Sequence, residues 1–436
     1  MPGWYSSQMK TKLIKKVLSN GLRVLFVPMK DNPTVTVTVL VGTGSDYEPQ
    51  VQSGISHFLE HMCFKGTVRR PGVSDISREL DSLGAHYNAF TDHEITGYYA
   101  KVESKYAPEI LDIVSDIYLN STFPQSEIEK ECGVIIEEIN MYEDMPQSQA
   151  QQLFTSNMYK GQPAGRDVLG TKDSVTKINR EDFVAYHKKF YVPNNTVVVV
   201  AGSFDLPKMF ELVKKHFSRT IKKPLPKIIK TTDKQRTYNA NVLYKPTDQS
   251  HLVFGFHGVK IGHKDETALA LVGSLLGGGM SSRLFTKLRD EMGVCYYVNA
   301  QMDSATSYGS IEITAGVTNS RVQEVLNILL KEFKSLKNTL VSEEEIKRTK
   351  QYMVGTMKLN LESSNSLAMY FGVQETLTGK VVTPEERVKK IMAVNNKDIM
   401  RVAKKIFRIE KSNTALVGPW TDPAMLTSIL GTSGVL

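Results

Sequence analysis

A helix-to-strand pattern that occurs twice most constrains the fold of this chain. The first copy is an amphipathic segment at residues 178–190 with paired lysines near its end, followed by an apolar strand signal at 197–202. The second copy has the same features at residues 394–406 and 414–418, at an offset of 394 − 178 = 216. Coincidence between two generic amphipathic helices is the alternative. We interpret the pattern as an internal duplication, with halves of roughly 200 residues that match the usual size of a domain.

A lysine- and proline-rich stretch near the midpoint separates the two halves. Residues 219–236 contain few candidates for a hydrophobic core, which is typical of an extended surface linker. A looser correspondence also supports two halves: Gly84 and Asn88-Ala89 recur as Gly293 and Asn299-Ala300. We therefore expect an N-terminal domain at residues 1–218 and a C-terminal domain at residues 237–436.

Strand and helix signals are interspersed along the first half. Asn20-Gly21 between two apolar runs predicts a tight β-hairpin. Further strands are expected at residues 34–39, 85–90, 96–102 and 196–201, and helices at 53–64, 74–83, 107–119, 126–142 and 180–190. This order predicts the α+β class, with two homologous domains that are each a mostly antiparallel sheet with helices packed on one face.

Composition argues against several functional classes. The net charge is +8, but the lysines are scattered and form no basic stripe with aromatic residues, so we expect no nucleic-acid partner. No apolar run reaches the ~18 residues that span a bilayer, and the start lacks the apolar core of a secretory signal. Three cysteines, Cys63, Cys132 and Cys295, are an odd and sparse set typical of a reducing compartment. We expect a cytoplasmic protein of bacterial type, or a protein of an organelle matrix if a presequence has been removed.

An H-x-x-E-H motif at residues 57–61 is the strongest chemical signal in the sequence. Helix residues i and i+4 share one face, so His57 and His61 can aim two imidazoles at one point. Glu60 projects beside them and can reach a water molecule on a metal ion. A lone histidine is most often solvated or satisfied within a core. Two histidines one turn apart with a glutamate between them instead predict a metal site, because this motif is the inverted counterpart of H-E-x-x-H.

A catalytic metal needs a further protein ligand, and the helix expected at residues 126–142 offers one. Glu131 and Glu138 are seven residues apart, so they lie on one helix face, with Val134 and Ile135 between them. A carboxylate beside such an apolar strip needs a partner, which a metal ion or a metal-bound histidine supplies. An ordinary solvated acidic helix is the alternative that the spacing leaves open.

These segments together resemble the pitrilysin-type inverzincin peptidases, in the branch that is similar to mitochondrial processing peptidases. The match is nearly residue for residue over 57–67 and 131–144, and the resemblance extends over essentially the whole chain. The separation between the second histidine and the later glutamate, 138 − 61 = 77, is also of the family's size.

The resemblance assigns roles to the acidic and histidine side chains. It implies that His57, His61 and Glu138 hold one Zn²⁺ per chain, so that residues 1–218 form the catalytic domain. It makes Glu60 the general base and Glu131 a residue that orients a metal ligand. Manganese or cobalt could replace zinc on such ligands.

The resemblance also singles out two residues of the second half. Arg289 and Tyr296 are seven positions apart (296 − 289 = 7), and an Arg and a Tyr at this spacing bind the substrate backbone and the developing oxyanion in active members. Without the resemblance, a surface arginine and a packed tyrosine would be favoured. The second half has no H-x-x-E-H, which implies a degenerate copy that closes over the substrate. The glycines at 277–279 lack a phosphate-loop pattern and predict a flexible or closely packed turn.

Candidate substrate contacts come from the same resemblance. It implies that the strand with Asn88 and Ala89 is an edge strand that pairs with the bound peptide, largely irrespective of side chains. Phe64 is a further candidate contact, with an ordinary core position as the alternative.

The prediction that follows is a zinc-dependent endopeptidase for short or unfolded polypeptides. Two chains are expected to pair as a homodimer that encloses a chamber. The main alternative is a non-catalytic or partner-dependent scaffold subunit of a processing-peptidase-like complex. In a third interpretation, activity requires a different, inactive partner chain.

Overall fold

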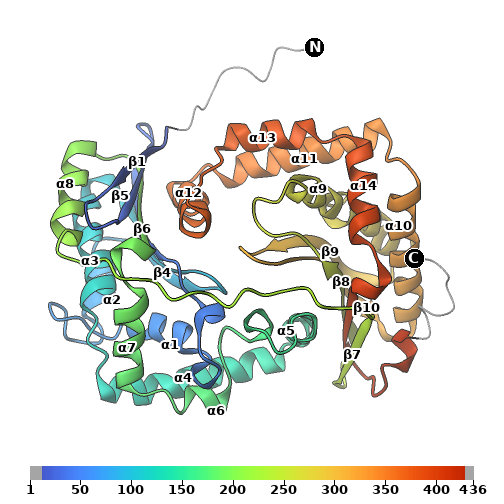
Figure 1. Cartoon of the computed structure of the whole chain (residues 1–436), viewed down its shortest axis with the longest axis horizontal. Coiled ribbons are helices and arrows are strands. Elements are labelled where there is room, and N and C mark those ends of the chain that lie inside the picture. Colours follow the sequence, from blue (N-terminus) through green and yellow to red (C-terminus); the bar gives the residue numbers. More distant parts are fainter. Residues whose placement is uncertain (1–11, 428–436) are drawn as a thin grey trace. The chain divides into compact units, whose positions relative to one another are not determined.

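The computed structural model describes residues 12–427 of the 436, and the chain divides into two compact units (Figure 1). The first unit comprises residues 12–135, 168–228 and 358–388. The second comprises residues 136–167, 229–357 and 389–427. Each unit contains one mixed sheet with helices, so the predicted α+β class is confirmed. Within residues 12–427, no helix is long and apolar enough to cross a membrane.

The sheet of the first unit has six strands in the order β1-β2-β6-β3-β5-β4. The strands are β1 (Ile14–Val17), β2 (Arg23–Pro28), β3 (Thr34–Val41), β4 (His86–Thr91), β5 (Thr96–Glu103) and β6 (Thr196–Gly202). Only β2 and β6 are parallel neighbours; the other pairs are antiparallel. Gly21 turns between β1 and β2 at φ +88°, which confirms the hairpin predicted from Asn20-Gly21. β4 ends the strand order and is therefore an edge strand.

The sheet of the second unit repeats this arrangement with five strands. Its strands are β7 (Asn239–Tyr244), β8 (Gln249–His257), β9 (Cys295–Ser304), β10 (Gly309–Thr318) and β11 (Ser412–Gly418). Their order is β7-β11-β8-β10-β9, with one parallel pair, β7 and β11, followed by antiparallel pairs. This is the order and direction of β2-β6-β3-β5-β4, strand for strand. The topology therefore supports the predicted duplication.

Local chemistry repeats as well as topology. Helix α7 (Arg180–Phe190) precedes β6, and helix α14 (Asn396–Ile406) precedes β11. Each begins with an asparagine, Asn179 or Asn395, whose side chain accepts a hydrogen bond from the backbone three residues on within a capping box. The offset of these caps, 395 − 179 = 216, equals the offset between the two copies of the sequence pattern.

The remaining helices follow the two-unit division with three exceptions. Those of the first unit are α1 (Ile55–Met62), α2 (Asp75–Ser82), α3 (Ala107–Asn120), α6 (Lys172–Val175), α8 (Leu206–Phe217) and α12 (Ser364–Thr378). Those of the second are α5 (Pro146–Met158), α9 (Glu266–Gly277) and α10 (Val322–Asn338). The helices α4 (Gln125–Asp144), α11 (Glu343–Asn360) and α13 (Pro384–Ala393) each cross a division between the units.

Helix α12 comes from the second half of the sequence but packs in the first unit. Its buried Phe371 joins a hydrophobic cluster that includes Val199 of β6. On the opposite face of the same sheet, Phe26 of β2 contacts Phe210 of α8. Helices therefore cover both faces of this sheet, whereas the sequence predicted helices on one face only. We call α12 an exchanged helix, because it belongs to the second half of the sequence and covers the sheet of the first unit.

Helix α5 is exchanged in the opposite sense. It comes from the first half and packs on the sheet of the second unit, where Phe154 joins a cluster with Val253 and Val417. The contiguous domains expected at residues 1–218 and 237–436 therefore do not coincide with the compact units. The apolar face of each exchanged helix is buried on a sheet that is built mainly by the other half of the chain.

Candidate metal centre

Helix α1 carries the H-x-x-E-H motif, and a buried carboxylate fixes its first turn. Gly54 at the N-cap position adopts φ +94° and has no side chain to cap the helix. Glu48 takes this role, because its Oε2 and Oε1 accept hydrogen bonds from the backbone N–H groups of Gly54 and Ser56, both at 2.8 Å. A carboxylate at a helix N-terminus is also favoured by the helix dipole. A side chain could not replace Gly54, since its Cβ would lie 2.5 Å from the carbonyl oxygen of Leu169.

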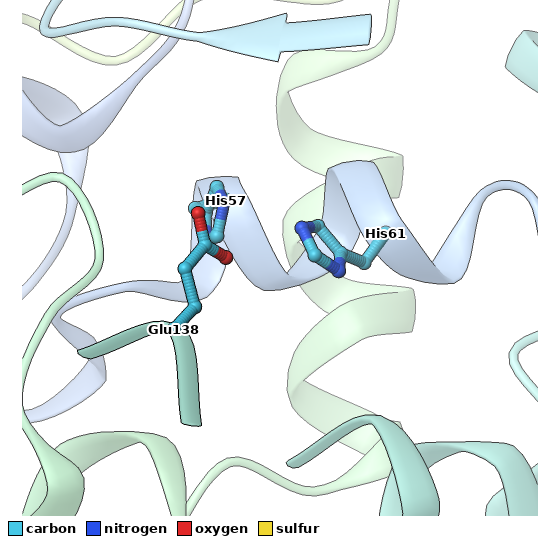
Figure 2. Close-up of side chains that lie close together, drawn as sticks. All are labelled: His57, His61 and Glu138. Atoms are coloured by element: carbon cyan, nitrogen blue, oxygen red, sulfur yellow. The ribbon is translucent and has the colours of Figure 1, made fainter. Parts of the chain in front are cut away.

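The three predicted ligands converge in the structure. The rings of His57 and His61 lie one turn apart on α1, with centroids 4.6 Å apart. One donor atom from each of His57, His61 and Glu138 lies within 4.8 Å of the other two. Figure 2 shows the Glu138 carboxylate beside the histidine-bearing helix. Two imidazoles and one carboxylate form a donor set that suits a catalytic zinc ion and leaves a coordination position open.

The surroundings of His57 keep its ring neutral. Burial, and then repulsion from His61, lower the pKa of His57 from 6.5 to about 3. A neutral imidazole offers a lone pair to a metal ion, whereas a protonated ring offers none. The donor chemistry of these residues therefore fits a divalent metal. No second group of three such side chains occurs in the described part of the chain, residues 12–427.

Glu131 holds the second histidine in place. Its Oε1 lies 2.9 Å from Nδ1 of His61, and its Oε2 pairs with Nζ of Lys65 at 2.6 Å. Burial opposes ionisation of Glu131, but the hydrogen bonds from His61 and Lys65 outweigh it and lower the pKa of the carboxyl group. A hydrogen bond from Nδ1–H to a carboxylate leaves Nε2 of His61 for a metal. Since α4 is one continuous helix, the element anchored through Glu131 also carries Glu138 two turns further on.

Glu60, the predicted general base, has a partner that the motif does not contain. Thr91 Oγ1 donates a hydrogen bond to Glu60 Oε2 at 2.6 Å. Thr91 is the last residue of the edge strand β4, and Glu60 is 8% exposed. Thr91 and Glu48 were not recognised from the sequence, because neither is part of a spacing that identifies ligands. Thr91 lies three residues after Asn88 on the strand that was predicted to be a peptide-binding edge, but no role was predicted for it.

The candidate substrate contacts lie around β4. Asn88 is exposed and Ala89 is half-buried on this strand. Phe64, just beyond α1, is also half-buried, and its ring stacks on Tyr87 of β4 with centroids 6.5 Å apart. The edge of β4 that does not pair with β5 has no neighbouring strand among the described residues. Such an edge is a template for an extended peptide.

Arg289 lies in the second unit on an irregular helix. Residues Phe285–Glu291 form a π-helix, and the exposed guanidinium group of Arg289 lies 5.0 Å from the ring centroid of Phe285. Helical turns of this kind are rare and occur frequently at functional sites. The part that Arg289 plays in catalysis stays a prediction.

Tyr296 lies in the same unit at an irregularity of strand β9. The residues on either side of it, Cys295 and Tyr297, pair with the adjacent residues Val317 and Gly316 of β10. Tyr296 is therefore the extra residue of a β-bulge, and its side chain is 69% exposed. Bulges redirect side chains and are common next to active sites. The role of Tyr296 also stays a prediction.

The duplicated α+β fold, with an H-x-x-E-H helix and a later carboxylate that meet at one point, defines the class of inverted-motif metallopeptidase folds. Comparison with protein-family models agrees with this class. Residues 23–172 match the model described as insulinase (peptidase family M16), and residues 177–353 match the model described as peptidase M16 inactive domain.

Curated relatives resemble the chain over nearly its whole length. A protein of Bacillus subtilis (strain 168) named "Uncharacterized zinc protease YmxG" is 34% identical over 410 residues, which cover 92% of this chain and 97% of the relative. An "Uncharacterized zinc protease" of Rickettsia felis is 32% identical over 412 residues, which cover 92% of this chain and 96% of the relative. The chain therefore belongs to the insulinase family, peptidase family M16, a family of zinc proteases.

Solved structures share the fold. A protease from Helicobacter pylori matches with a TM-score of 0.88 and 25% sequence identity, over 94% of this chain and all (100%) of that one. A structure described as the peptidase M16 inactive domain from Pseudomonas fluorescens matches with a TM-score of 0.87 and 17% identity, over 94% and 98% of the two chains. The second likeness concerns the fold alone.

Proposed function

We propose that the protein is a zinc-dependent endopeptidase that hydrolyses peptide bonds in short or unfolded polypeptides. The observation that carries this proposal is the convergence of His57, His61 and Glu138, with Glu60 on the same helix as the two histidines. Membership of a family of zinc proteases supports a peptide substrate.

In this proposal, His57, His61 and Glu138 hold one zinc ion per chain. Zinc, when bound, acts as a Lewis acid that polarises a carbonyl group and makes water nucleophilic near neutral pH. The neutral ring of His57 and the hydrogen bond from His61 to Glu131 keep both imidazoles ready to act as ligands. Manganese and cobalt remain alternative metals for this donor set.

Glu60 is the proposed general base. Its carboxylate takes a proton from the attacking water and later delivers it to the nitrogen of the leaving amine. Arg289 and Tyr296 are proposed to bind the substrate backbone and to stabilise negative charge on the tetrahedral intermediate. Their exposed side chains on a π-helix and a β-bulge support this role.

The edge of β4 that does not pair with β5 is the proposed binding site for the substrate peptide. Pairing with the backbone of Asn88 and Ala89 uses main-chain hydrogen bonds and depends little on side chains, which suits unfolded polypeptides as substrates. Phe64 is proposed to contact a substrate side chain, since its ring is only half-buried. A homodimeric chamber that excludes folded proteins completes the proposal. The free thiols of Cys63, Cys132 and Cys295 fit a reducing compartment such as the cytoplasm.

A scaffold subunit without activity is the second candidate. The family model that matches residues 177–353 carries the description "inactive domain", and members of one fold need not share an activity. The complete set of His57, Glu60, His61 and Glu138 in one place favours the enzyme instead.

The decisive experiment is an assay of the purified single chain against quenched unstructured peptides. We expect cleavage that a chelator abolishes and that added zinc restores, whereas the Glu60→Gln variant should stay inactive with zinc. Absence of cleavage by the zinc-loaded chain alone, with cleavage appearing on addition of a second subunit, would support the partner-dependent alternative. Cleavage that is indifferent to the chelator would contradict the proposed mechanism.

A further inference from the structure

One face of the edge strand β4 lies on the helix that carries the motif. Side chains alternate along a strand, so Tyr87, Ala89 and Thr91 point to the same face. Two of these three contact α1 or the residues directly after it: the Tyr87 ring stacks on Phe64, and the Thr91 hydroxyl bonds to Glu60. Helix α1 and β4 are also neighbours along their backbones. The strand is thus attached to the helix near both of its ends, with the small Ala89 between the two contacts.

The contact between Thr91 and Glu60 is short and comes from a stiff part of the backbone. A hydroxyl donor at 2.6 Å from a carboxylate oxygen has the length of a charge-assisted hydrogen bond. Thr91 pairs with Thr96 of β5, and the turn beyond it is closed by a hydrogen bond from Asp92 N to the carbonyl of Ile95. Threonine is β-branched, so its side chain has few conformations. The donor is therefore fixed before any substrate binds.

We propose that Thr91 is a positioning residue that orients the Glu60 carboxylate and ties it to the strand on which the peptide is expected to lie. This inference rests on the proposed function, because it deepens the role of Glu60. Its consequence is geometric: the base on α1 is tied by this hydrogen bond to the strand that offers the peptide-binding edge, so a peptide paired with β4 is held in register with the base. Misplacement of a reacting group by about 1 Å can cost about 100-fold in rate.

Three variants separate positioning from packing and from substrate binding. Thr91→Val keeps the branched shape and removes the hydroxyl, whereas Thr91→Ser keeps the hydroxyl. Thr38→Val is a matched control in the same sheet, since the buried Thr38 hydroxyl has no hydrogen-bond partner among residues 12–427. We expect Thr91→Val to lower kcat by about 10- to 100-fold at unchanged KM and zinc content, because a hydrogen bond to a charged group is lost. Thr91→Ser and Thr38→Val should stay close to the wild type.

Crystal structures of the two Thr91 variants give a readout that does not depend on activity. The Glu60 carboxylate should leave its position in Thr91→Val and keep it in Thr91→Ser. An unmoved Glu60 in Thr91→Val would overturn the proposal, as would an increase in KM at constant kcat, which indicates a substrate contact instead. Equal losses in Thr38→Val and Thr91→Val would reveal a general packing effect. If the wild type shows no chelator-sensitive cleavage, the proposed function fails, and the position of Glu60 still decides the role of Thr91.

Discussion

Helices α1 and α9 occupy the same place in the two units and carry different chemistry. Each follows a strand, β3 or β8, that has the same neighbours in its sheet. α1 presents His57, Glu60 and His61, whereas α9 buries mainly leucine, alanine and valine and has one ionisable residue, Glu266, in its first turn. The shared fold thus requires only an apolar face at this position, and the residues proposed to bind metal occur in one copy alone.

Helices α4 and α11 differ in the same way. Their starting residues are related by an offset of 343 − 125 = 218. This offset places Thr349 and Thr356 where the first copy has Glu131 and Glu138. The second copy therefore lacks the carboxylates as well as the histidines, which agrees with the description of its family model as an inactive domain. Fold symmetry and chemical asymmetry coexist in one chain.

The largest expected effect tests whether only the first unit, through Glu60 of α1, supplies the general base. Glu60→Gln should retain zinc and lose about 1,000-fold in kcat, because general-base catalysis contributes on this order. Glu266→Gln makes the same change on α9 and should leave kcat unaltered. Steady-state kinetics with metal analysis checks both variants. A similar loss in the two would break the comparison, since it would show that the second copy also supplies catalysis.

A smaller effect is expected at the residue that holds His61. Glu131→Gln should weaken zinc affinity by about 10- to 100-fold, because outer hydrogen bonds orient metal ligands. Glu129→Gln changes an exposed residue of the same helix and serves as the control. Competition with a chelator of known affinity measures the difference. Unchanged affinity in Glu131→Gln would mean that His61 needs no support from α4.

The exchanged helices α12 and α5 differ in the polar contacts that attach them to their sheets. Glu375 of α12 is buried in the first unit and is paired with Lys15 Nζ at 2.7 Å and with Arg23. Lys15→Met should lower the free energy of unfolding by about 2 kcal/mol, because it leaves a buried charge with less compensation. Denaturant unfolding measures this change. A loss below the error of the measurement would mean that apolar packing alone holds α12.

In the second unit, Glu312 lies beneath α5, and its carboxyl group forms no ion pair with a lysine or arginine among residues 12–427. Glu312 of β10 accepts hydrogen bonds from Gln151 of α5 and from Ser310. Burial raises the pKa of Glu312, and these hydrogen bonds offset only part of the rise. The folded state therefore favours the protonated form, and stability falls as the pH rises from the unfolded value of about 4.3 through the folded pKa.

The smallest expected effect follows from the loss of stability that the raised pKa of Glu312 causes at higher pH. Glu312→Gln should raise stability at neutral pH by about 1 kcal/mol, since a neutral amide replaces a buried group that tends to ionise. Below about pH 4 the variant and the wild type should be equally stable, because the carboxyl group is then protonated in both folded and unfolded states. Thermal unfolding over this pH range provides the test. A variant that is less stable at every pH would show that the carboxylate is needed.

Much of the fold was predictable because it depends on local patterns. The helix at residues 180–190, the hairpin at Gly21 and the H-x-x-E-H helix each follow from short spacings that have a direct structural cause. The exchange of α5 and α12 was not predictable in this way. Helical periodicity shows that a face is buried, but the sheet that buries it is distant in the sequence, and no helix was predicted at α5.

The residues of the candidate site also divide into those that local sequence patterns identify and those that only the structure identifies. His57, His61 and Glu138 were found from spacing and resemblance, and their side chains do converge. Glu48 contacts the start of α1 from the segment just before it, and Thr91 contacts Glu60 from strand β4. Spacing along one helix reveals neither contact. Arg289 and Tyr296 were singled out only by resemblance, although their irregular backbone is an independent sign of functional constraint.

The most direct test of this account is anomalous diffraction at the zinc absorption edge from crystals of the zinc-loaded protein. The account predicts one peak per chain, bounded by His57, His61 and Glu138, and none beside α9 and α11. A peak elsewhere, or no peak between the two histidines and Glu138, would contradict a metal centre confined to the first copy.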